Sequence, residues 1–154
     1  MKNEKIPLAA VLGSPISHSK SPMLHGYWLN KYGINGHYIP MDVSSIDLNN
    51  VLTTLPKIGF VGANITLPHK ENVLKVANKI SDRAAMIGAA NTLSFGLNGQ
   101  IYADNTDGYG FIENIRYHQP DWRATEGPSL VLGAGGASRA IVFSLLENAA
   151  PEIW

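Results

Sequence analysis

The sequence predicts an α/β fold that contains a mostly parallel sheet. Short apolar runs alternate with segments of helical periodicity along the 154 residues, which is the pattern of strand–helix–strand units. The first run, residues 8–12, closes at Gly13-Ser14-Pro15, as expected of a buried parallel strand. Apolar residues make up 45% of the chain and charged residues 16%, a composition that supports a core and is unlike that of disordered chains.

A helix is expected to begin at Ser21-Pro22, with Ser21 as its N-cap, and to end at Gly33. Its apolar face is expected to pack inward and consists of Leu24, Tyr27, Trp28 and Tyr32. Strands are expected at residues 37–43 and 58–65. Between them, Ser44 or Ser45 should cap a helix that runs to Leu55.

The next elements are a helix over residues 70–77, with Val73, Leu74 and Ala77 facing in, and a short helix over residues 81–87. Residues 92–95 and 101–103 flank Asn98-Gly99, which predicts a β-hairpin. A further helix is expected from Asp107 to the region of His118.

A change in composition divides the chain. Residues 119–128 (QPDWRATEGP) are expected to form a linker, residues 129–132 a strand, and residues 133–149 a glycine-rich turn followed by a helix. The turn is similar to the dinucleotide fingerprint G-x-G-x-x-G/A, with Ser138 in place of the third glycine. A glycine-rich turn without a ligand is the alternative. We therefore expect a three-layer domain over residues 1–118, followed by the first βα unit of a Rossmann-type domain over residues 129–154.

Charge and cysteine content exclude several classes of protein. Twelve basic and twelve acidic residues give a net charge of zero, which argues against nucleic-acid and membrane partners. The chain has no cysteine, so disulfides and thiolate metal sites are excluded, and the spacing of its five histidines predicts no metal site. The apolar run over residues 6–12 is short and follows Glu4, which favours a first strand over a secretory signal and predicts a cytoplasmic protein.

Four polar clusters fall where strands and helices meet, at residues 17–21, 64–70, 91–92 and 105–108. Taken singly, each has an ordinary explanation in helix capping or turn formation. Ligand crevices of α/β proteins form at such junctions, however. Hydroxyls, amides, Lys70 and Asp107 together indicate a site for a small, neutral to anionic molecule rich in hydroxyl groups.

Five motifs in this order resemble those of shikimate dehydrogenases. They are GSPISHSKSP (13–22), NITLPHK (64–70), GAANT (88–92), NTDG (105–108) and GAGGAS (133–138). His69 stands where the family often has an aromatic residue. The resemblance covers essentially the whole chain, but family members are longer. The remainder would include most of the nucleotide domain, with the basic residues that hold the 2′-phosphate, and a late glutamine and tyrosine at the substrate.

The resemblance implies an NADP-dependent oxidoreductase that reduces 3-dehydroshikimate to shikimate in aromatic amino acid biosynthesis. It implies that Ser19 and Ser21 bind the substrate carboxylate, that Thr66, Asn91 and Asp107 bind ring hydroxyls, and that Lys70 and Asp107 form the catalytic pair. Lys70 would act either as proton donor or as fixed charge. The cofactor would contact the turn formed by Gly133, Ala134, Gly135, Gly136 and Ala137.

Two alternatives stay open at this point. One is a non-catalytic hydroxy-acid-binding domain made by truncation, and the other is activity on quinate, against which Ser21 argues weakly because threonine there would favour quinate. One strand and one helix bury little apolar surface. Partial exposure, or coverage by a second chain in a homodimer, is therefore expected for Val131, Leu132, Ile141, Phe143 and Leu145.

Overall fold

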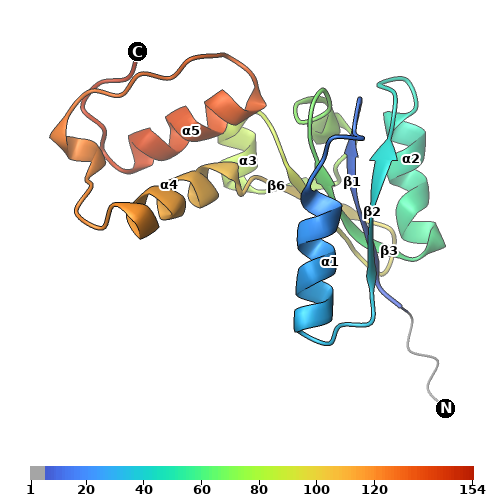
Figure 1. The fold of residues 1–154 in the computed structure, drawn as a ribbon. Coiled ribbons are helices and arrows are strands. Elements are labelled where there is room, and N and C mark those ends of the chain that lie inside the picture. The colour runs from blue at the N-terminus through green and yellow to red at the C-terminus, as the bar shows by residue number, and fades with distance from the viewer. Residues whose placement is uncertain (1–5) are drawn as a thin grey trace.

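The computed structural model describes residues 6–154 and is built on a six-stranded sheet in the order β2-β1-β3-β5-β6-β4 (Figure 1). The strands are β1 Leu8–Gly13, β2 His37–Asp42, β3 Phe60–Ile65, β4 Lys79–Ile80, β5 Thr92–Phe95 and β6 Ile101–Asp104. Parallel pairs join β1 to β2, β1 to β3 and β4 to β6, whereas β5 is antiparallel to both of its neighbours. Five strands therefore run in one direction and β5 alone runs the other way, which confirms an α/β fold with a mixed, mostly parallel sheet.

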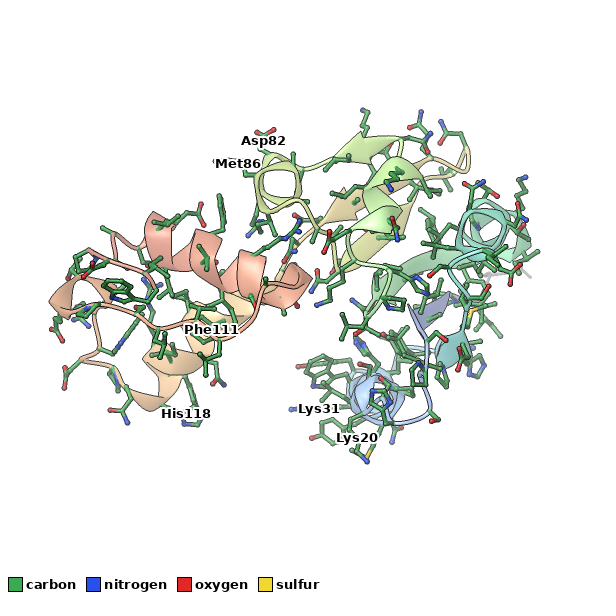
Figure 2. All side chains as sticks on the ribbon, turned by 90° about the horizontal axis from the view of Figure 1, so that it is seen from above. Lys20, Lys31, Asp82, Met86, Phe111 and His118 are labelled. Carbon is green, nitrogen blue, oxygen red and sulfur yellow. The ribbon has the colours of Figure 1, made fainter. Side chains whose placement is uncertain are left out.

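The helices lie on the two sides of this sheet and beyond one end of it (Figure 1). They are α1 Ser21–Lys31, α2 Leu48–Thr54, α3 Asp82–Ile87, α4 Asp107–His118 and α5 Gly136–Glu147, with 3-10 turns η1 Leu55–Ile58, η2 Asn72–Lys75 and η3 Ala124–Glu126. Helices α1 and α2 lie on opposite sides of the β2–β1–β3 end (Figure 1). Figures 1 and 2 both show α4 and α5 side by side at the other end of the molecule, with α3 between them and the sheet.

The main core lies between the sheet and α2. Strand β1 is buried on both faces, as its continuous apolar sequence requires. Ala10 and Leu12 share one core cluster with Leu48 and Leu52 of α2, and strand alternation places Val11 on the opposite face. The hairpin formed by β5 and β6 is confirmed, with Thr92 paired to Asp104 and Phe95 to Ile101. Helix α3 is confirmed as well, because the Ser81 hydroxyl caps it by accepting the N–H of Ala84 at 3.1 Å.

The expectation for the first helix is wrong in two respects. Its N-cap is Lys20, so Ser21 is the first helical residue. Its apolar face is not packed inward either, since the expected core residues are 42–67% exposed: Leu24, Tyr27, Trp28 and Tyr32. Figure 2 looks along this helix, with Lys20 and Lys31 labelled beside it, and its side chains project around it. Aromatic residues at helical spacing thus identified the helix but not its buried side.

Three other boundaries also differ from expectation. Residues 70–77 form only the 3-10 turn η2, although Val73 is fully buried as expected. Helix α2 begins at Leu48, because Ser44 caps a preceding turn by accepting the N–H of Asp47. The two-residue strand β4 was not predicted, since a strand this short has no periodic pattern.

The part of the chain after residue 118 packs on α4. Ala124 and Leu145 form a second core with Ile112, so Leu145, at 4% exposed, contradicts the expectation that it is partly exposed. Val131, Ile141 and Phe143 are half-buried and Leu132 is 86% exposed, in agreement with it. In place of a strand at residues 129–132 there is an isolated parallel bridge between Ser129 and Ile153.

Candidate functional site

The reversal of β5 brings the polar clusters to one edge of the sheet. Strands β1, β3 and β6 all point their carboxyl ends at this edge, where residues 14–21, 66–70 and 105–107 follow them. Because β5 runs the other way, Asn91 reaches the same edge from the amino end of its strand. Asn91 is fixed there by its backbone, whose carbonyl accepts the N–H of Ile65 and whose N–H donates to Asp104.

Lys70 and Asp107 form an ion pair at the centre of this edge. The Lys70 Nζ donates to Asp107 Oδ2 at 2.5 Å, and the two side chains are 13% and 28% exposed. Asp107 Oδ1 accepts a second hydrogen bond, from Asn91 Nδ2 at 2.7 Å. Three of the residues expected at the site are therefore joined directly. Because Lys70 and Asp107 are partly buried, the attraction between their charges is stronger than in a pair on the surface.

The threonines around Asn91 hold its amide in one orientation. Asn91 Oδ1 accepts from the Thr106 backbone N–H at 3.0 Å and from the Thr92 hydroxyl at 2.8 Å. Because its oxygen is occupied by donors, its Nδ2 is directed toward Asp107. The Asp107 carboxylate thus has a neighbour on each oxygen.

Two residues that were not expected at the site extend the network toward α1. Tyr38 of β2 donates its hydroxyl to Asn64 Oδ1 at 2.7 Å, and Asn64 Nδ2 reaches the Asn91 carbonyl at 3.3 Å. Burial raises the pKa of Tyr38 to about 12, and the nearby Ser21 hydroxyl opposes this to a smaller extent. Asn64 belongs to the NITLPHK motif, so the motif itself was the signal that could have identified it.

His25 of α1 supports Tyr38 from the other side. The two rings are stacked with their centroids 4.0 Å apart and an angle of 8° between their planes. Burial lowers the pKa of His25, because an imidazolium would lose hydration there. A neutral ring on the Tyr38 face keeps this part of the edge uncharged.

Asp104, at the end of β6, has a carboxyl group whose pKa is shifted by its surroundings. Burial raises its pKa, but hydrogen bonds from the Ser81 hydroxyl and the Asn105 N–H, together with Arg83, outweigh burial and leave the pKa of Asp104 lowered. Its role is to tie α3 to the end of β6, beside the Asn105–Asp107 segment.

The two serines lie at the start of α1. Ser19 Oγ accepts the N–H of Ser21 at 3.3 Å, which leaves the Ser19 hydroxyl hydrogen free to donate elsewhere. Thr66, at the end of β3, is half-buried and packs its methyl group toward Gly13. Ser19, Ser21 and Thr66 thus lie along the same edge of the sheet. Among the described residues they make no hydrogen bond to the Lys70–Asp107 pair.

His69 is part of the core although Lys70 follows it in the chain. It is fully buried, and its Nε2 lies 2.6 Å from the Val43 carbonyl oxygen to which it donates. A flat ring in this position fills the space that an aromatic residue would fill.

The glycine turn before α5 lies next to Lys70. Gly133 has φ +121°, a conformation that favours glycine, and Gly135 is the N-cap of α5 with no side-chain capping bond. A Cβ at Gly135 would meet no described atom within 4 Å beyond its chain neighbours, so a ligand can approach the backbone here. The turn therefore fits the pyrophosphate of a dinucleotide, which binds backbone N–H groups at a helix N-terminus.

The part of the chain that the structure describes, residues 6–154, contains no group of three or more metal-ligating side chains. None of its helices is long and apolar enough to cross a membrane.

The fold and the site define an α/β protein with a polar site at the carboxyl edge of its sheet. A glycine turn of the nucleotide-binding type lies beside this site in space. The family model of the shikimate dehydrogenase substrate binding domain matches residues 11–93, more than half of the chain. The chain belongs to this family.

Relatives and solved structures agree with this assignment. A shikimate dehydrogenase (NADP(+)) of Roseobacter denitrificans is 61% identical over 153 residues, which are 99% of this chain and 55% of that protein. One of Cereibacter sphaeroides is 59% identical over 97% of this chain and 53% of its own length. The shikimate dehydrogenase of Thermus thermophilus, solved in complex with shikimate, superposes with a TM-score of 0.90 at 37% identity, covering 97% of this chain and 56% of that one. The chain thus spans about half the length of the relatives that it matches.

Proposed function

We propose that this chain is the substrate-binding part of a shikimate dehydrogenase, which reversibly reduces 3-dehydroshikimate to shikimate with NADPH in aromatic amino acid biosynthesis. The observation that carries the proposal is the Lys70–Asp107 ion pair, placed between the carboxyl edge of the sheet and the glycine turn. In this proposal residues 1–118 form a three-layer substrate domain, residues 119–128 a linker, and residues 129–154 the start of a Rossmann-type domain. The names of the relatives and the complexes of the Thermus enzyme with shikimate and NADP(H) support it.

In this proposal the residues around the pair bind different groups of the substrate. Ser19 and Ser21 bind the carboxylate through hydroxyls at the start of α1, where the helix dipole favours an anion. Thr66, Asn91 and Asp107 bind the ring hydroxyls. Asn64 lies within the same hydrogen-bond network and adds an amide to this group.

Lys70 donates and accepts the proton of the reaction. When the ketone is reduced its oxygen gains a proton, and the Lys70 ammonium donates it; in the reverse direction the amine takes a proton from the hydroxyl. The same ammonium stabilises negative charge that develops on the oxygen. Asp107 holds Nζ in place and accepts from a neighbouring substrate hydroxyl, while Asn91 fixes the carboxylate.

NADPH, when bound, supplies the hydride that reaches the carbonyl carbon. Gly133, Ala134, Gly135, Gly136 and Ala137 would hold its pyrophosphate through backbone N–H groups at the first turn of α5. A cytoplasmic location and a homodimer, with a second copy covering the exposed Leu132, belong to the same proposal.

The test is steady-state kinetics on a longer chain, in which the part of the relatives' length that this chain does not span is also present. Lys70→Ala should lower kcat by about 10²–10⁴ while KM changes little, because the interaction is used mainly in the transition state. Lys75→Ala is the matched control, since Lys75 is an exposed lysine of the same segment whose side chain bonds only to Asn72 among the described residues. A kcat for Lys70→Ala within about twofold of wild type would reject the catalytic role. If the wild-type protein binds shikimate without turnover, the non-catalytic alternative holds, and preferred turnover of quinate would correct the substrate.

A further inference from the structure

Gly136, the first residue of α5, packs against the stem of Lys70. A Cβ at position 136 would lie 3.2 Å from Lys70 Cβ, 3.4 Å from Lys70 Cδ and 3.2 Å from Ala89 Cβ. These distances are tighter than ordinary van der Waals contacts between carbon atoms. Gly136 is buried, in contrast to the exposed residues Gly133, Ala134 and Gly135 before it.

The neighbouring glycine faces elsewhere. Around Gly135 the space for a Cβ is open among the described residues, whereas around Gly136 it is filled by Lys70 and Ala89. The requirement for glycine is therefore different at the two positions. Gly135 leaves room for a ligand outside the protein, and Gly136 leaves room for a side chain inside it.

Both segments that Gly136 touches lead to the site. The Lys70 carbonyl accepts the N–H of Ala90 at 2.8 Å, and the Ala89 carbonyl accepts from Asn105 Nδ2 at 2.9 Å. Ala89 and Ala90 precede Asn91, and Asn105 precedes Asp107 by two residues. One close contact from α5 therefore bears on the backbone of all three members of the Lys70–Asp107–Asn91 cluster.

An ion pair accompanies this contact one helical turn later. Arg139 of α5 lies 3.3 Å from the Glu71 carboxylate, and its guanidinium also covers Gly88. Both partners are about half exposed, so the pair itself adds little to stability. The packing of Gly136, rather than this ion pair, fixes the distance between α5 and Lys70.

We infer that Gly136 is a positioning residue for Lys70, and that the nucleotide turn holds the catalytic lysine in place through the stem of its side chain. The inference rests on the proposed function for the identity of the ligand. Lys70 extends from its Cβ, past Gly136, to Asp107, so the first turn of α5 packs along one side of the lysine stem. A methyl group on this side would displace the lysine by a few tenths of an ångström without changing the exposed backbone of the turn.

The first experiment measures shikimate binding to the 154-residue chain by calorimetry, without nucleotide. Gly136→Ala is expected to weaken shikimate about threefold, since Lys70 is one of its proposed ligands and is displaced. Gly110→Ala is the control and should leave shikimate affinity unchanged, because Gly110 is an exposed glycine of α4 where a Cβ meets none of the described side chains within 4 Å. Arg139→Ala is the control for the ion pair and should also leave it unchanged.

The second experiment separates positioning from loss of fold. Gly136→Ala combined with Ala89→Gly removes the contact with Ala89 and keeps the contact with Lys70. If Gly136 positions Lys70, the thermal midpoint recovers in the double variant while the threefold weakening persists. If shikimate affinity recovers together with the midpoint, the effect is structural and the inference is wrong.

The third measurement is turnover in the longer chain. Gly136→Ala should lower kcat about tenfold with a smaller change in KM, because catalysis is sensitive to misplacement well below 1 Å. The change should largely vanish in a Lys70→Ala background, since coupled residues are not additive. Equal effects of Gly110→Ala and Gly136→Ala on both shikimate binding and kcat would overturn the inference and leave the proposed function intact. Absence of shikimate binding to the wild-type chain would instead overturn the proposed function.

Discussion

Gly108 of α4 lies directly against Ser144 of α5. A Cβ at position 108 would overlap the Ser144 hydroxyl and would lie 2.6 Å from the backbone oxygen of Ala140. Rotation of the serine side chain could relieve the first contact but not the second. The two helices therefore approach closely at the residue that follows Asp107.

Gly108→Ala should destabilise the protein by about 1–3 kcal/mol, because an added methyl group forces the helices apart. Gly110→Ala is the matched control on the same helix, where a Cβ meets none of the described side chains within 4 Å. Alanine is the better helix former, so this control should be neutral or stabilise by about 0.5–1 kcal/mol. Urea unfolding of both variants measures the difference, and equal stabilities would show that α4 and α5 are not held at this distance.

Ser19→Ala and Ser21→Ala should each weaken shikimate by about 0.5–1.5 kcal/mol, or up to about 3 kcal/mol if the bond is charge-assisted. Ser17→Ala is the control, since Ser17 is an exposed serine of the same loop. An analogue with a neutral group in place of the carboxylate should be nearly insensitive to both changes. Similar losses for shikimate and for this analogue would assign the serines to another part of the ligand.

The 154-residue chain should bind shikimate but hold NADPH only weakly. The segment after residue 128 contains one helix and an isolated bridge, and it leaves several large apolar residues exposed: Leu130, Leu132, Leu146 and Trp154. Pyrophosphate can reach the glycine turn, but in this chain the adenosine and its 2′-phosphate gain few contacts. Calorimetric titration with both ligands tests this expectation. Tight NADPH binding or dehydrogenase activity from a verified monomer of this length would contradict it.

Alkaline pH should weaken the fold through Tyr38. Its pKa is about 12 in the folded protein against an ordinary value of 10, so the folded state holds the phenol proton more tightly. This contribution to stability is fully present below about pH 10 and is lost as the pH rises toward 12. Ultraviolet titration should show a phenolate that forms late and is absent in Tyr38→Phe. A titration that is the same in both proteins would place Tyr38 in a more hydrated environment.

The sequence predicted the elements whose signals are local. Asn98-Gly99 identified the hairpin, and Ser81 marked the start of α3. The direction in which a helix is buried was less predictable, since the aromatic residues of α1 form a stripe that could face a core or a surface. The expected helix at residues 70–77 is only one 3-10 turn because residues outside it compete for its ends. The N–H of Ala90 donates to the Lys70 carbonyl, and the N–H of Asn78 donates to Ile101 of β6.

The site could be predicted only as a set of motifs. Lys70, Asn91 and Asp107 were expected to meet because strand ends share an edge, and the direct hydrogen bonds between them are consistent with that. Tyr38 was missed because its contact with Asn64 spans 26 positions in the chain. The contact of Gly136 with Lys70 joins residues still further apart, and no local pattern signals it.

The reversed direction of β5 also places the hairpin turn at the end remote from the Lys70–Asp107 pair. Asn91 lies at one end of the hairpin, and the turn around Leu97 lies at the other, about 13 Å away for a four-residue strand. Leu97 is fully exposed there, and Gly99 with φ +79° completes a tight turn. The turn is therefore suited to the attachment of a dye, a peptide tag or a surface tether. Paired strands β5 and β6 connect it to Asn91, whose amide bonds to Asp107.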